Sequence, residues 1–149
     1  MNGMNHRCAA LWLACAIGSA AFLPAAAEEG RAESHLSVPE SGVGSGIADR
    51  ELEGEGDRFA EGTAVVFWTR VVGGQEGERI RHVWLREGQE VISIGLTLGG
   101  PQWRTYSRKT LHPGSAGNWT VEARDGEDRV IARAEFVCVG DESATEPGE

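Results

Sequence analysis

The sequence predicts an all-β fold, a small antiparallel β-sandwich of immunoglobulin-like or meander type. Between Arg58 and Val139 the apolar residues recur with period two, and no stretch of this body has a helical period. Gly or Asp-Gly turns arrive about every eight to twelve residues, a spacing typical of sandwiches and barrels. A body of about 80 residues is large enough for a single hydrophobic core.

Six strands are expected within this body, at residues 63–72, 79–87, 90–98, 102–110, 118–124 and 129–138, with a further edge strand from before Glu61. The segments between them contain the Gly, Pro or Asp that tight turns require. If consecutive strands pair as hairpins, Val83 lies opposite Ile94 and Trp119 lies opposite Ala134. One face of the meander is then apolar and sets large residues against small ones, as a filled core needs.

The other face of the meander is expected to carry rings and positive charges. With this pairing it displays His82, Trp84, Arg104, Tyr106 and Arg108, beside Phe67. Aromatic faces stack on apolar ring surfaces and guanidinium groups clamp anions, so these five residues, without Phe67, are the candidate binding residues. The alternative is that the last hairpin or the preceding segment covers this face, so that its rings belong to the interior.

Residues 1–27 have the composition of a secretory signal peptide. A short segment ending in Arg7 precedes an apolar run, and the small residues Ala25–Ala27 precede an expected cleavage before Glu28. A lipoprotein anchored at Cys15 is the less favoured alternative, because the apolar run continues to Leu23. We therefore expect a periplasmic or secreted protein with no transmembrane helix after processing.

The net charge of −9 resides in the two ends of the chain. Residues 28–57 contain nine acids and two arginines, and residues 139–149 contain four acids and no base. Residues 58–138 are nearly balanced, with ten acids and eleven bases. We expect a disordered, Gly- and Ser-rich linker at 28–57, a folded domain at 58–139 and a disordered acidic tail at 140–149. Acidic ends repel nucleic acid and anionic membranes, so neither is an expected partner.

The sequence offers little that could support catalysis. Cys138 is the one cysteine left after processing and is expected to be a small buried hydrophobe without a disulfide. The histidines are scattered, so no metal or other cofactor is expected. Ser107, His82 and His112 are the only candidates for acyl transfer, and no Gly-x-Ser-x-Gly elbow presents the serine. We therefore do not expect an enzyme.

A set of motifs resembles a known family. The motifs are His82-x-Trp84, Trp103-Arg104-x-x-Ser107-x-Lys109 and Gly117-x-Trp119-x-Val121. Together they are similar to the bacterial domain of unknown function 2914, over roughly residues 58–139. The resemblance implies a short β-rich domain in a secreted or membrane-attached protein, and it implies no particular activity.

These observations favour a non-catalytic binding module of the bacterial cell envelope. Its aromatic and arginine face suits glycan or other cell-wall material, because flat rings fit sugar rings and arginines fit acidic groups. The alternative is a structural protein-protein interaction domain that docks on another envelope protein through a sheet edge or through the same face.

Overall fold

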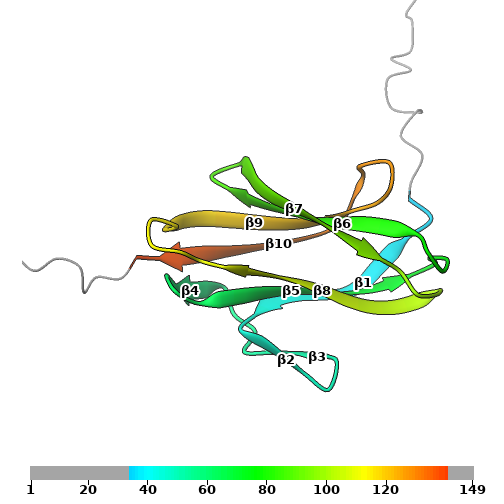
Figure 1. Ribbon diagram of the computed structural model, residues 1–149, viewed down its shortest axis with the longest axis horizontal. Helices are drawn as coiled ribbons and strands as arrows, with labels where there is room; N and C mark the ends of the chain where they lie inside the picture. The colour runs from blue at the N-terminus through cyan, green and yellow to red at the C-terminus, as the bar shows by residue number, and fades with distance from the viewer. Residues whose placement is uncertain (1–33, 141–149) are drawn as a thin grey trace, which may run out of the picture. The chain divides into compact units, whose positions relative to one another are not determined.

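The computed structural model describes residues 34–140 (Figure 1). These residues form strands joined by turns and contain no helix that could span a membrane. The strands are β1 (Ser37–Gly44), β2 (Gly46–Ala48), β3 (Glu51–Glu53), β4 (Arg58–Ala60), β5 (Ala64–Val72), β6 (Arg79–Arg86), β7 (Gln89–Thr97), β8 (Gln102–Thr110), β9 (Gly117–Arg124) and β10 (Val130–Val139). The expected signal peptide, with its alternative anchor at Cys15, lies outside the described residues, as does the tail from residue 141.

The strands form two packed sheets and a small hairpin. The order is β1-β5-β8 in the three-stranded sheet and β4-β10-β9-β6-β7 in the five-stranded sheet, while β2 pairs with β3. All neighbours are antiparallel except β4, which runs parallel to β10. The predicted all-β, mainly antiparallel sandwich is confirmed.

The core between the two sheets is built around aromatic rings. Phe67 of β5 and Trp84 of β6 are both fully buried there. The rings of Trp84 and Phe136 meet edge to face with centroids 6.1 Å apart, and Trp119 stacks on Phe136 at 6.0 Å. Cys138 is buried in the same cluster with a free thiol, as expected, and this burial raises the pKa of the thiol.

The six predicted strands correspond to β5–β10, and every boundary lies within one residue of the expected one. The predicted order of pairing is wrong. β5 pairs with β1 and β8 rather than with β6, and β7 and β8 end different sheets instead of pairing with each other. Both faces of β5 are apolar, with Phe67 buried on one face and Trp68 on the other, so the sequence pattern does not say which strands lie beside it.

Two expected hairpins form with a shifted register. In β6–β7 an irregularity between Trp84 and Leu85 places His82 opposite Ile94, where the sequence predicted Gly95. The one-residue shift places Ile92 and Ile94 of β7 on the face that carries His82 and Trp84, and this face, not the opposite one, points into the core. In β9–β10 Trp119 lies opposite Phe136 rather than Ala134, a two-residue shift that keeps the same face.

The disordered linker expected at 28–57 is wrong for residues 34–57. This segment contains β1–β3, and β1 pairs with β5 from Ser37 opposite Val72 to Gly44 opposite Val66. A Cβ atom at Gly42 or at Gly44 would lie 2.9 Å from a methyl carbon of Leu52. The glycines therefore allow the β2–β3 hairpin to pack closely against β1, a role that composition alone does not separate from that of a flexible linker.

Candidate functional site

The structure divides the predicted binding residues between two places. His82 and Trp84 are fully buried between the sheets, whereas Arg104, Tyr106 and Arg108 are exposed on the outer face of the three-stranded sheet. The predicted continuous face of five residues is therefore wrong, because the meander on which it depended does not form. For His82 and Trp84 the alternative of a covered face is the correct one.

His82 belongs to a polar network that joins the two sheets. Its Nδ1 atom lies 2.8 Å from Ser107 Oγ on β8, and its Nε2 atom lies 3.3 Å from Thr69 Oγ1 on β5. The indole Nε1–H of Trp84 also donates to Ser107 Oγ, at 3.1 Å. These side chains are buried, so each polar group must find its partner inside the protein.

One arrangement of protons satisfies this whole network. Ser107 accepts from Trp84 and donates to His82 Nδ1, while His82 Nε2–H donates to Thr69, which donates to the backbone oxygen of Thr105 at 3.4 Å. The imidazole is then neutral, and burial lowers the pKa of His82 to about 3. Shielded from solvent, Ser107 and His82 bridge the two sheets.

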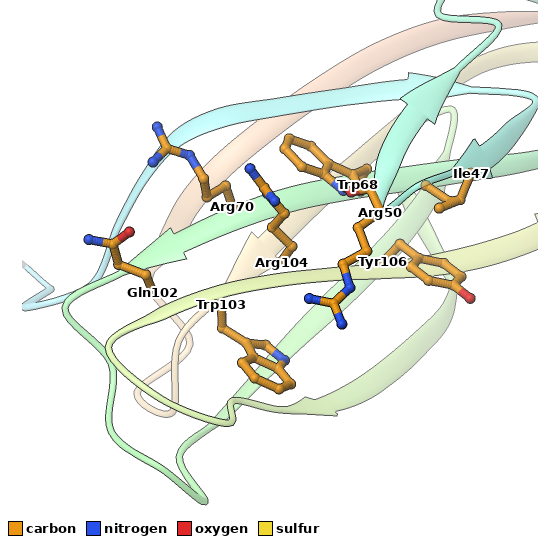
Figure 2. Close-up of a pocket in the computed structure, with 8 residues that line it drawn as sticks. All are labelled: Ile47, Arg50, Trp68, Arg70, Gln102, Trp103, Arg104 and Tyr106. Carbon is orange, nitrogen blue, oxygen red and sulfur yellow. Dashed lines mark hydrogen bonds between the residues drawn. The ribbon is translucent and has the colours of Figure 1, made fainter.

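A groove of about 670 Å³ opens on the outer face of the three-stranded sheet (Figure 2). It is lined by Ile47, Arg50, Trp68, Arg70, Gln102, Trp103, Arg104 and Tyr106. These residues come from β2, from the turn that follows it, from β5 and from β8. Arg108 is exposed on the same face of β8 but does not line the groove.

The floor of the groove is made of two cross-strand pairs. Trp68 on β5 lies opposite Tyr106 on β8, and two residues further along these strands Arg70 lies opposite Arg104. Directly opposed residues on antiparallel strands point to the same face, with Cβ atoms about 5 Å apart. A pair of rings therefore lies beside a pair of guanidinium groups, both facing the groove.

The β2–β3 hairpin covers part of this floor. The indole Nε1–H of Trp68 donates to the backbone oxygen of Arg50 at 2.9 Å, which fixes the hairpin turn above the sheet. Asp49 and Arg50 in this turn have φ angles of 49° and 68°, values that side-chain-bearing residues rarely adopt. Figure 2 shows the Arg50 side chain extending from the hairpin toward β8. The turn therefore places a third guanidinium group, that of Arg50, over the floor of the groove. Its backbone conformation is one that glycine or asparagine usually adopts.

Two exposed carboxylates partly balance the charge of the groove. Glu40 on β1 pairs with Arg70 at 2.9 Å, and Glu51 on β3 pairs with Arg104 at 3.4 Å. Both carboxylates are more than half exposed, and ion pairs of this kind contribute about 0–1 kcal/mol each. The Nε atom of Arg70 is buried and has no hydrogen-bond partner within residues 34–140. The groove therefore keeps an excess of positive hydrogen-bond donors.

Arg50, Trp68 and Arg70 are among the six lining residues that sequence reasoning did not select as binding residues. Arg50 lies in the segment that was expected to be a linker, and Phe67 was expected on the outer face, which by alternation placed its neighbour Trp68 on the core face. The sequence signal that could have identified this face is Arg70, the one charged residue of its strand, two positions after Trp68. With period-two alternation, Arg70 marks the face of Trp68 as the outer one.

Among residues 34–140 no cluster of three or more His, Cys, Asp or Glu side chains could hold a metal ion. A comparison with curated proteins finds no match. The family model described as "Protein of unknown function (DUF2914)" matches residues 77–138, which span β6–β10. The groove draws residues from inside this match, on β8, and from before it, on β2 and β5. The match lies within roughly residues 58–139, where the sequence motifs indicated a resemblance to this domain of unknown function.

Proposed function

We propose that the chain is a non-catalytic binding module and that its site is the groove between the β2–β3 hairpin and the outer face of the three-stranded sheet. The observation that carries the proposal is the floor of the groove, where the pair Trp68 and Tyr106 lies beside the pair Arg70 and Arg104. Like charges directly opposite each other in a sheet are destabilising, so the arginine pair is a cost that a ligand offsets.

The ligand class follows from the side chains. Exposed aromatic rings stack on the apolar faces of sugars, and arginine binds carboxylates or phosphates through two parallel hydrogen bonds. A glycan that bears acidic groups satisfies both requirements, and its anions can replace the weakly held Glu40 and Glu51. Acidic cell-wall material is our proposed ligand, and the expected signal peptide supports a site in the cell envelope.

A non-catalytic role is supported by the position of the one serine and histidine pair that sequence reasoning considered. Ser107 and His82 are buried between the sheets, where the network of Trp84 and Thr69 uses their hydrogen-bonding groups. The groove itself contains no histidine, serine or cysteine and no carboxylate pair among its lining residues. General acid-base and nucleophilic chemistry most often use such groups.

The test is a binding titration with soluble acidic wall fragments, with matched neutral fragments as the reference ligand. Arg104→Ala and Tyr106→Ala should each weaken binding by about tenfold or more, because contact residues at the centre of a site carry most of its affinity. The matched control is Arg133→Ala, an exposed arginine on β10 that also pairs with a carboxylate, Glu135. Equal binding by all three variants, or by the neutral fragments, would contradict the proposal.

The alternative, docking of another envelope protein on the same groove, gives a different result in the same experiment. The purified protein would then ignore the glycan fragments, and Arg104→Ala would instead lower the retention of a protein partner from envelope extract.

A further inference from the structure

Natural proteins protect sheet edges by short strands, prolines, irregular pairing and charges, particularly lysine. The edge strand β7 is nine residues long, and such features occur only near its start, where Glu90 is its one charged residue and where the pairing with β6 is irregular between Glu90 and Ile92. From Ile92 to Thr97 the strand pairs regularly with β6 and carries no charge and no proline. A long edge segment of this kind is a site for pairing with another strand.

The other sheet edges in residues 34–140 are protected. β4, at the far side of the same sheet, has three residues. β1 contains Pro39 and a register shift between Ser37 and Glu40. β8 carries three positive charges, Arg104, Arg108 and Lys109. The contrast isolates β7, which Figure 1 shows at the margin of the five-stranded sheet.

Apolar side chains are exposed at this same edge. Val91 is 49% exposed and Ile92 is 42% exposed. Ile92 on β7 lies opposite Trp84 on β6. Trp84 is fully buried whereas Ile92 is partly exposed, so the inner face of the sheet is covered at β6 and open to solvent at β7. Burial of these residues by a neighbouring strand would favour pairing, because it removes apolar surface from water.

We propose that β7 pairs antiparallel with β7 of a second copy of this chain, with Ile94 on the two-fold axis. In this register Val91–Thr97 pairs with itself, and this stretch contains no charged residue. Ile92 of each copy lies opposite Leu96 of the other, and Ser93 lies opposite Gly95. The two five-stranded sheets join into one continuous sheet, in a closed and symmetric interface.

The distribution of charge favours self-pairing of β7 over self-pairing of β8, the other long edge strand. Antiparallel pairing of β8 with a second β8 about Tyr106 would place Arg104 opposite Arg108 of the other copy, and like charges in this position repel. β7 meets itself without any such pair. Because a single strand pair buries a small area, the dimer is weak and forms at high micromolar concentration or above.

The test is sedimentation equilibrium of the purified protein over a range of concentrations. The wild-type chain should show a monomer-dimer equilibrium. Ile92→Lys should weaken association at least about 100-fold, because it places a charge between the two paired β7 strands. The matched control is Ser41→Lys, the same change at an exposed position of the β1 edge, which should leave association unchanged.

Hydrogen exchange of the wild-type chain gives a second measurement that needs no variant. Amides of residues 91–97 should become more protected as the protein concentration rises, because pairing engages groups that a free edge leaves to solvent. A chain that stays monomeric up to about 1 mM, a dimer that persists in Ile92→Lys, or protection confined to other strands would each overturn the proposal.

Discussion

Arg70 and Arg104 lie directly opposite each other on β5 and β8, so two positive side chains share one face of an antiparallel pair. Each is held by a carboxylate from a neighbouring strand, Glu40 for Arg70 and Glu51 for Arg104. These are surface ion pairs, which offset such repulsion only weakly. The arrangement stabilises the fold little, and the proposed acidic ligand would bridge the two guanidinium groups.

Replacement of one of these arginines should weaken ligand binding and leave the stability of the protein nearly unchanged. Arg104→Thr removes the repulsion and introduces a residue that favours strands, so the free energy of unfolding should change by no more than about 0.5 kcal/mol. Binding of the acidic ligand should be largely lost. Thermal melts and binding titrations on the same sample check this. A loss of stability above about 1 kcal/mol would show that the arginine pair holds the hairpin in place.

Trp84→Ala should destabilise the protein by about 3–5 kcal/mol, because the side chain is fully buried and contacts Phe136 in the core. The free energy of unfolding of a protein is typically about 5–15 kcal/mol, so this substitution removes a large part of the stability. Denaturant unfolding followed by circular dichroism measures the loss. Tyr106→Ala, which truncates a ring that is 47% exposed, is the control and should cost less than about 1 kcal/mol. Similar costs for both variants would contradict our assignment of the two faces.

The sequence predicted the strands well because strand positions depend on local alternation and turn residues, and these are strong from Val65 to Cys138. It predicted the pairing poorly because pairing depends on which faces are covered. β5 is apolar on both faces, so nothing in its own residues shows that β1 and β8 are its neighbours. The error at His82 had a different cause, a bulge that changes the register by one residue.

The candidate site was predicted in part. Arg104 and Tyr106 were chosen correctly as outward-facing residues of one strand, since alternation along β8 is enough to place them together. Their partners Trp68 and Arg70 depend on strand order, and Arg50 depends on a hairpin hidden in a Gly-rich acidic segment. Glycine there allows close packing on Leu52, and that reason is visible only in three dimensions.

The free energy of unfolding should fall as the pH falls from 6.5 toward 4.5. The pKa of His82 is about 3 in the folded protein and about 6.5 in the unfolded chain, so in this range only the unfolded chain gains a proton. The loss approaches about 1.4 kcal/mol per pH unit for this group. His82→Gln should show a shallower slope, and denaturant unfolding at several pH values measures it. Equal slopes would mean that His82 is reached by protons in the folded state.

Removal of residues 1–57 should prevent cooperative folding, whereas a chain that begins at Ser34 should fold. The longer deletion removes β1 and leaves one edge of β5 unpaired, together with the apolar side chains that β1 and the hairpin cover. Thermal unfolding of the two truncated chains tests this. A cooperative transition in the chain that begins at Arg58 would show that the first strands are an accessory to the fold.

The most direct test of the proposed binding groove is an NMR titration of the purified protein with soluble acidic wall fragments, followed at the indole N–H groups. Trp68 lines the groove and donates to Arg50, while Trp84 and Trp119 are buried between the sheets and serve as internal references. We expect a saturable shift of the Trp68 signal, with the signals of Trp84 and Trp119 nearly unchanged. Saturable shifts confined to other parts of the molecule, or no shift at all, would contradict it.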